Sequence, residues 1–313
     1  MANINYQQTA KEIIAFLDRI KTERPDNVMT MFFVQKPSRE KFVSFKPQIS
    51  TELQKKILDM VLPSAIKSLQ LTVVPYNPVG AADEENELLP PSRVESVERF
   101  LESIKQENLF TDMSELKIGR INFYGIQISF DGYTVYLFRQ FSKMSKLRKG
   151  IISQFINNEL REMDTDFLGI DELCDMVLHD DVLLILNHIS LERIFNYRDE
   201  YLRITNAAIG EIVNQSIMVN VEQFSDDCQR DVRIMKRFTD MMSKDRLPLF
   251  FEHYDRVPEI VNTLNLDLEF DEDRKIIYRE KSQLFHIINL MSDSYFKSLL
   301  AERFGVAKTE DIL

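Results

Sequence analysis

The sequence predicts an α+β fold, in which antiparallel sheets pack against long helices and a small α/β unit lies at the N-terminus. Amphipathic stretches with apolar residues three or four positions apart indicate helices, and short runs of β-branched and aromatic residues indicate strands. The Asp131-Gly132 pair between two such runs is typical of a β-hairpin. A chain of 313 residues with 44% apolar and 28% charged residues has a globular composition and is long enough for about two domains.

Residues 1–76 are expected to form the N-terminal α/β unit. Its two helices and three strands are predicted over residues 10–20, 28–34, 41–45, 53–61 and 71–74. Ser50 is placed to cap the second helix, because its hydroxyl can accept a hydrogen bond from an N–H of the first turn. Residues 77–92 are expected to be an acidic, proline-rich connector that is exposed, and residues 93–313 the main α+β domain.

The register of the central hairpin follows from its turn. Both positions of a type I′ turn need positive φ, which the Asp131-Gly132 pair tolerates. All six apolar side chains nearest the turn then share one face, in the pairs Phe130 with Tyr133, Ile128 with Val135, and Ile126 with Leu137. The same register places Arg139 opposite Tyr124 at the far end of the hairpin.

The C-terminal half is expected to be mainly helical. A second strand pair is predicted at residues 174–178 and 182–186. From about Ser190 the helical spacing continues for about seven turns, which suits a central packing or dimer helix. A further helix is predicted over residues 221–243, and short helices and strands complete the chain.

Positive charge is concentrated in one segment of an acidic chain: the formal net charge is −11, yet residues 132–158 contain no Asp or Glu. Five cations lie in that segment, namely Arg139, Lys143, Lys146, Arg148 and Lys149. A second basic stripe is expected on one face of the 221–243 helix, formed by Arg230, Arg233 and Arg237. Exposed Lys and Arg clusters contact phosphates and release counterions, so both sets are candidate DNA-binding residues. The alternative is that both are solvated faces that pair with the protein's own carboxylates.

Signatures of catalysis and cofactor binding are missing from the sequence. Its eight glycines form no phosphate-binding loop or dinucleotide-binding turn and its four histidines show no zinc motif, so no cofactor and no small-molecule substrate is expected. Cys174 and Cys228 are expected to be reduced core thiols. The acids best suited to a nuclease metal site precede Lys275, at Asp267, Glu269, Asp271 and Asp273. Without a signal peptide or an apolar stretch of bilayer length, the chain is expected in the cytoplasm.

Four segments carry a recognisable apolar pattern, RINFYGI, YTVYLFR, VLLILN and LERIFNYRDEY, at residues 120–126, 133–139, 182–187 and 191–201. They resemble the KwaB family of Kiwa anti-phage defence systems, and the resemblance extends from about Arg93 to the C-terminus. It implies a protein that binds double-stranded DNA to restrain phage replication or transcription, and that works at the inner membrane face with a KwaA-like multi-spanning protein. It supplies no catalytic motif and no DNA-contact residue, so the candidate cations rest on charge alone.

Three accounts of function follow. In the preferred one, the chain is a non-catalytic, largely sequence-independent DNA-binding effector, acts as a homodimer, and is deployed by the membrane partner. In the second, it is a metal-dependent nuclease that uses the acids before Lys275. In the third, it binds no DNA and serves as an adaptor, with the acidic connector contacting the membrane partner.

Overall fold

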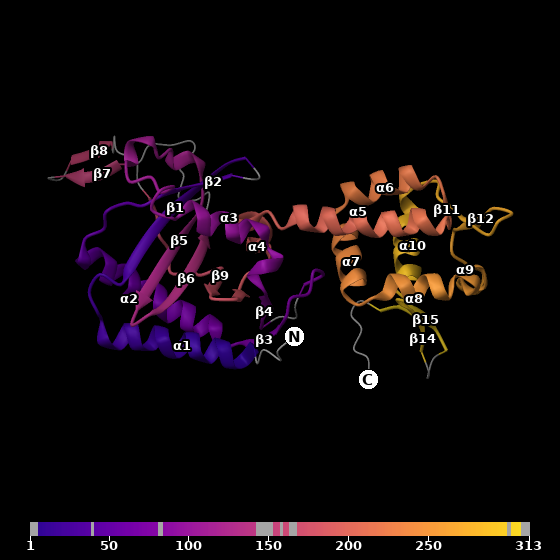
Figure 1. Ribbon diagram of the computed structural model, residues 1–313, viewed down its shortest axis with the longest axis horizontal. Helices are drawn as coiled ribbons and strands as arrows, with labels where there is room; N and C mark the ends of the chain where they lie inside the picture. Colours follow the sequence, from indigo (N-terminus) through magenta and orange to yellow (C-terminus); the bar gives the residue numbers. More distant parts are fainter. Residues whose placement is uncertain are drawn as a thin grey trace. The chain divides into compact units, whose positions relative to one another are not determined.

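Figure 1 shows a computed structural model that describes residues 6–38, 41–80, 84–141, 153–156, 159–162, 168–298 and 302–307. The chain forms two compact units: unit 1 comprises Met1–Tyr76 and Gly80–Tyr197, and unit 2 comprises Asn77–Val79 and Arg198–Leu313. Its helices and its large, mostly antiparallel sheet confirm the predicted α+β class. Within these ranges, no helix has both the length and the apolar composition that crossing a membrane requires.

Unit 1 is built on one sheet of eight strands. In spatial order the strands are β2 (Lys41–Phe45), β1 (Met29–Ser38), β5 (Ile121–Phe130), β6 (Tyr133–Gln140), β9 (Met176–His179), β10 (Val182–Ile185), β4 (Glu85–Leu89) and β3 (Thr72–Pro75). Neighbouring strands run antiparallel except β3 and β4, which are parallel. A separate antiparallel hairpin consists of β7 (Ser153–Ile156) and β8 (Glu159–Glu162).

The predicted register of the β5–β6 hairpin is confirmed at every pair. Phe130 lies opposite Tyr133 next to the turn, and Tyr124 lies opposite Arg139 at the far end. The turn residues Asp131 and Gly132 have φ values of 49° and 78°, as a type I′ turn requires. The hairpin therefore fixes where the side chain of Arg139 leaves the sheet.

Two long helices cover one face of the sheet, α1 (Tyr6–Glu23) and α2 (Thr51–Leu69) (Figure 1). Their apolar faces and the inward side chains of β5 and β6 form one buried cluster. Ser50 caps α2 as predicted, because its hydroxyl accepts a hydrogen bond from the N–H of Leu53 at 3.3 Å. The N-terminal segment thus packs on the same sheet as the central hairpin.

Two shorter helices cover the opposite face, α3 (Glu95–Ser103) and α4 (His188–Phe195). Their contact with the sheet is aromatic. The ring of Phe100 lies 5.8 Å from that of Phe123 on β5 and 5.1 Å from that of Phe138 on β6. Phe195 lies 5.3 Å from Phe138, edge to face, so one cluster holds both helices to the sheet.

The sequence predicts an exposed connector over residues 77–92, but the structure has a strand there, β4. It pairs with both β10 and β3, and the carboxylate of Glu87 is only 2% exposed, with Oε2 2.6 Å from Nδ1 of His188. The imidazole of His188 in turn stacks on the ring of Tyr76 at 5.4 Å. Glu85–Leu89 of the predicted connector are therefore part of the sheet, and the chain passes between the units at residues 77–79 and again after Tyr197.

Unit 2 is mainly helical around a core of its own. Its helices are α5 (Arg198–Gln215), α6 (Val221–Arg230), α7 (Val232–Ser243), α8 (Arg246–Glu252), α9 (Val257–Leu264) and α10 (Leu284–Met291). Its strands form a three-stranded sheet of β11 (Met218–Val219), β13 (Ile276–Ile277) and β12 (Glu269–Phe270), and a hairpin of β14 (Tyr295–Lys297) and β15 (Phe304–Val306). Short 3₁₀ helices across the two units are η1 (Pro91–Arg93), η2 (Met113–Glu115), η3 (Ile118–Arg120), η5 (Tyr254–Arg256) and η6 (Lys281–Gln283).

The long helix predicted from Ser190 is interrupted near its start, at Asn196, so the prediction of one continuous helix is wrong. Asn196 ends α4 in the left-handed conformation, with φ 54°, and α5 begins two residues later. Lys36 of β1 holds this end, because its ammonium group donates to the carbonyl oxygens of Arg193 at 2.6 Å and Ile194 at 3.0 Å and to Oδ1 of Asn196 at 2.7 Å. A cation at the negative end of a helix stabilises it.

The helix predicted over residues 221–243 is interrupted as well. Asp231 has an extended backbone between α6 and α7, and its carboxylate accepts a hydrogen bond from the N–H of Arg233 at 3.0 Å. Asp is a favoured N-cap because its side chain satisfies an N–H of the first turn. The predicted basic stripe is therefore divided, with Arg230 on α6 and Arg233 and Arg237 on α7.

Candidate nucleic-acid interface

The candidate cations fall into two groups. Lys143, Lys146, Arg148 and Lys149 lie outside the described residues, and their part in DNA binding stays a prediction. Arg139 belongs to unit 1, and Arg230, Arg233 and Arg237 belong to unit 2.

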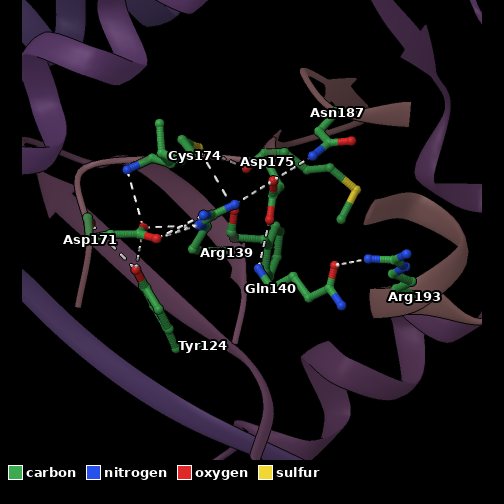
Figure 2. A network of polar contacts seen from close by, with 11 residues as sticks. Tyr124, Arg139, Gln140, Asp171, Cys174, Asp175, Asn187 and Arg193 are labelled. Atoms are coloured by element: carbon green, nitrogen blue, oxygen red, sulfur yellow. Dashed lines mark hydrogen bonds and ion pairs between the residues drawn. The ribbon is translucent and has the colours of Figure 1, made fainter. Parts of the chain in front are cut away.

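Arg139 is held by two carboxylates of its own chain (Figure 2). Its Nε and Nη2 donate to the carboxylate of Asp171, at 2.9 and 2.7 Å, and its Nη1 donates to Oδ1 of Asp175 at 3.0 Å. The side chains of Arg139 and Asp175 are 16% and 2% exposed. All three guanidinium nitrogens are therefore engaged inside the protein.

Asp175 also connects the ends of three strands. Its Oδ2 accepts a hydrogen bond from the N–H of Gln140 at 2.7 Å, and its Oδ1 accepts one from Nδ2 of Asn187 at 3.1 Å (Figure 2). Gln140 ends β6, Asp175 precedes β9, and Asn187 follows β10. Such charge-assisted bonds are roughly twice as strong as neutral ones. Asp175, held by Arg139, thus joins the ends of β6, β9 and β10.

The pKa of Asp171 agrees with a stabilising ion pair to Arg139. Burial acts to raise the pKa of its carboxyl, but hydrogen bonds and positive charge from Arg139 outweigh burial and hold the pKa below its ordinary value of 3.8. Hydrogen bonding to Asp171 raises the pKa of Arg139 in turn. The geometry favours a structural role for Arg139 and leaves little of its guanidinium for a phosphate.

A different arrangement surrounds Asp231 in unit 2. Asp231 is 9% exposed, with Oδ2 2.9 Å from Nη2 of Arg233 and 3.8 Å from Nζ of Lys281. The hydrogen bond from Arg233 is the main cause of the lowered pKa of this carboxyl. Arg230, which precedes Asp231, pairs loosely with Asp226 at 3.5 Å. The three cations are 72%, 75% and 57% exposed at Arg230, Arg233 and Lys281.

An aromatic ring completes this group. The guanidinium carbon of Arg233 lies 5.5 Å from the centre of the Phe285 ring, and Phe285 is 39% exposed at the start of α10. Cations beside exposed aromatic rings are typical of surfaces that bind nucleic acid. We name Asp231 with its partners Arg233 and Lys281, the preceding Arg230 and the ring of Phe285 beside Arg233 the Asp231 surface.

Arg237 does not share the exposure of Arg233, although it follows one turn later on α7. It is half-buried, and its Nη2 lies 3.5 Å from the hydroxyls of both Ser292 and Ser294. Burial lowers the pKa of its guanidinium. The structure therefore brings Arg233 together with Phe285 directly and with Lys281 through Asp231. The sequence did not predict Lys281 and Phe285, because no local pattern connects them to α7.

Two of the acids proposed for a nuclease, Asp271 and Glu269, have partners within or beside the β12–β13 hairpin. Oδ1 of Asp271 accepts a hydrogen bond from the N–H of Lys275 at 2.8 Å, and Glu269 pairs with Arg279 at 2.6 Å. In the part of the chain that the structure describes, no three His, Cys, Asp or Glu side chains lie close enough to hold a metal ion. Nuclease activity at these acids stays a prediction.

The fold and the site define a two-unit α+β protein whose helical unit presents cations and an aromatic ring on one surface. Residues 118–301 match the family model described as Kiwa protein KwaB-like. The match covers more than half of the 313 residues, so the chain belongs to the KwaB-like family and has a role in Kiwa anti-phage defence. It spans both the Arg139 network and the Asp231 surface. No curated protein and no solved structure matches the chain.

Proposed function

We propose that this KwaB-like chain is a non-catalytic effector that binds double-stranded DNA with little sequence preference. The observation that carries the proposal is the Asp231 surface, where the exposed cations Arg233 and Lys281 flank the carboxylate of Asp231 and the exposed Arg230 directly precedes Asp231 in the chain. Each cation can contact a phosphate and release the counterions condensed there. Membership of a defence family supports a function directed against phage nucleic acid.

The geometry of Arg233 suits phosphate binding. Its Nε and Nη2 donate to Asp231 at 3.2 and 2.9 Å, which fixes the orientation of the planar guanidinium. Among the described contacts none involves Nη1, so this nitrogen is the one offered to a phosphate oxygen. A preoriented guanidinium loses less side-chain entropy when it binds.

Lys143, Lys146, Arg148 and Lys149 form the second part of the proposed interface. Their support is sequence composition, since no acid lies within residues 132–158. They are tested separately from the Asp231 surface, so that either set can fail without the other.

Fluorescence anisotropy with two unrelated DNA duplexes of equal length tests the proposal. The variant R230Q/R233Q/K281Q is expected to lose affinity for both duplexes by about tenfold or more at 0.1 M salt, because three phosphate contacts are removed. The matched control is R24Q/K55Q/K105Q, which removes three exposed, ion-paired cations of unit 1. Equal losses in the two variants would leave only a nonspecific charge effect and contradict the proposal.

The proposal that the chain is non-catalytic has its own test. Duplex and single-stranded DNA incubated with the protein and Mg²⁺ or Mn²⁺ should remain intact. Cleavage that needs the metal and disappears in Asp271→Asn would replace this account with the nuclease account.

We also propose that the chain is a homodimer and, on family grounds, that it acts with a KwaA-like multi-spanning membrane protein. Light scattering should give twice the chain mass of 36.8 kDa. In membrane flotation, the protein should rise with vesicles that contain the membrane partner and stay at the bottom with vesicles that lack it. A monomeric mass, or flotation without the partner, would overturn the corresponding part.

A further inference from the structure

The hairpin of β14 and β15 presents apolar side chains to solvent. Phe296, Phe304 and Val306 are each about half exposed. In Figure 1 this hairpin extends beyond the helices of unit 2. Exposed apolar side chains that lie together mark interaction surfaces, and a two-stranded hairpin is only marginally stable until something packs on it. The hairpin is therefore a candidate interaction surface, and it shares no residue with the Asp231 surface.

The hydrogen bonds within the hairpin show which backbone groups point outward. The N–H of Ser298 donates to the carbonyl of Arg303 at 2.8 Å, so Arg303 directs its backbone groups toward β14. Successive residues of a strand direct these groups to opposite edges. The N–H and carbonyl groups of Phe304 and Val306 therefore point away from β14, to the outer edge of β15.

The residues on this outer edge are exposed rather than covered. Among the described strands β15 has one neighbour, β14, and both Phe304 and Val306 are exposed. In the described part of the chain, no group forms a hydrogen bond with the outward N–H or carbonyl of either residue. Such an edge is a template for one more strand.

The two faces of the hairpin differ. On one face the ring of Phe296 lies across Gly305, since a Cβ added to this glycine would be 2.8 Å from the ring. A ring in this position covers the bare backbone of the glycine. Phe304 and Val306 share the other face, because they are two residues apart on one strand. The outer edge thus combines free backbone groups with two apolar side chains.

A second copy of β15 fits this edge in one register. With antiparallel pairing about a two-fold axis at Gly305, Phe304 lies opposite Val306 of the second copy, and the reverse pair follows by symmetry. Both pairs are apolar, and each exchanges N–H and carbonyl hydrogen bonds. An axis at Phe304 would instead place Val306 opposite Glu302 of the second copy. The apolar pattern therefore selects the register about Gly305.

The charge of the hairpin permits two copies to meet. The chain carries a formal net charge of −11, but the charged residues described in this hairpin are Lys297, Glu302 and Arg303. Lys297 pairs with Glu302 at 3.6 Å, and Arg303 would lie opposite Ala307 of the second copy. Two copies therefore meet here without the repulsion that acidic surfaces produce.

We propose that the homodimer forms through this hairpin, by antiparallel pairing of β15 with β15 of a second copy about Gly305. The intermolecular sheet then has the order β14, β15, β15, β14. Phe304 and Val306 cover each other across the axis, and the two Phe296 rings approach over the paired glycines. This inference rests on the homodimer proposed above and names its interface.

Proline substitutions test the backbone pairing. Val306→Pro removes the outward N–H of this residue from each copy and leaves the bonds between β14 and β15 in place, so sedimentation analysis should show a dimer weakened by about tenfold or more. The matched control Lys297→Pro removes an N–H that points outward from β14, and should dimerise like wild type. A wild type that stays monomeric would contradict the homodimer itself. A wild-type dimer that Val306→Pro leaves unchanged would contradict this interface alone.

Complementary charges test the register. Phe304→Lys and Val306→Glu should each weaken the dimer, because each places a charge opposite an apolar side chain. An equimolar mixture of the two should recover it, since the introduced lysine and glutamate then lie opposite each other. Phe304→Lys mixed with Leu249→Glu, which changes an exposed residue of α8, should not recover it. Equal recovery in the two mixtures would overturn the register.

Hydrogen exchange identifies what occupies the edge. The amides of Phe304 and Val306 should exchange more slowly as the concentration of wild-type protein rises, whereas the amide of Lys297 should not. Slow exchange at every concentration would mean that the edge is covered within one chain. Slowing that requires another protein would assign the edge to that protein. Either result would overturn the proposal.

Discussion

The guanidinium of Arg139 and the carboxylate of Asp175 form a buried ion pair, with Nη1 3.0 Å from Oδ1 and side-chain exposures of 16% and 2%. The pair connects the end of β6 to the residue before β9, and Asp175 extends it to β10 through Asn187. A cation that suggests phosphate binding from the sequence is thus used to complete the sheet. The predicted DNA-binding segment of unit 1 is therefore reduced to four cations, Lys143, Lys146, Arg148 and Lys149.

Arg139→Met should therefore destabilise the fold rather than weaken DNA binding. Removing one member of a buried pair leaves an uncompensated carboxylate, which costs about 3–5 kcal/mol. Urea denaturation measures the loss. The control Arg203→Met removes a guanidinium that is 70% exposed and should change the free energy of unfolding by less than about 1 kcal/mol. A loss as small as that of the control would contradict the buried-pair account.

The stabilising effect of Asp171 should depend on pH. Its pKa is lower in the folded protein than its ordinary value of 3.8, so its contribution is present above that value and disappears as the pH falls through the folded pKa. Wild type should therefore exceed Asp171→Asn in stability near neutral pH, and the gap should close below about pH 4. Thermal melts across this range measure the gap. A gap that is constant with pH would contradict the assignment, and Asp180→Asn, at a site 84% exposed, serves as the control.

Lys36→Met should loosen the C-terminus of α4. The ammonium group of Lys36 donates to two terminal carbonyls and to Asn196, and loss of these bonds should cost about 1–2 kcal/mol. Hydrogen exchange at the last amides of α4 should quicken in the variant. Lys11→Met, which changes an exposed lysine of α1, should leave both readouts unchanged. Unaltered exchange in Lys36→Met would show that the cap is dispensable.

Arg233 and Arg237 form a matched pair one turn apart. Arg233→Gln should lower DNA affinity severalfold and reduce the salt dependence by about one counterion, because its side chain is 75% exposed. Arg237→Gln should leave DNA affinity within about twofold, since its guanidinium is turned to Ser292 and Ser294. A larger loss of DNA affinity in Arg237→Gln than in Arg233→Gln would place the interface on the other side of α7.

Local patterns were sufficient for the parts of the fold that one segment determines. The Asp131-Gly132 turn fixes the β5–β6 register because loop length and side-chain alternation leave one pairing. Periodicity also located the start of α6 and the end of α7. It could not reveal the break at Asp231, where a single capping carboxylate outweighs a continuous apolar stripe.

Contacts between distant segments were beyond such patterns. The partners of Arg139 lie 32 and 36 residues further along the chain, and Lys281 reaches Asp231 from a separate 3₁₀ helix. Strand β4 was missed for a similar reason, because Glu87 looks solvent-exposed until His188 is brought beside it. Charge composition therefore identified candidate cations, and the tertiary structure decided which described ones are exposed.

The salt dependence of DNA binding tests the central claim most directly. Plotted as log affinity against log salt, each phosphate contact contributes about −0.9 to the slope. R230Q/R233Q/K281Q should therefore have a slope shallower than wild type by about 2.7, whereas R24Q/K55Q/K105Q should be parallel to wild type. Wild-type and R230Q/R233Q/K281Q lines of equal slope would contradict the claim that the Asp231 surface binds the phosphates of DNA.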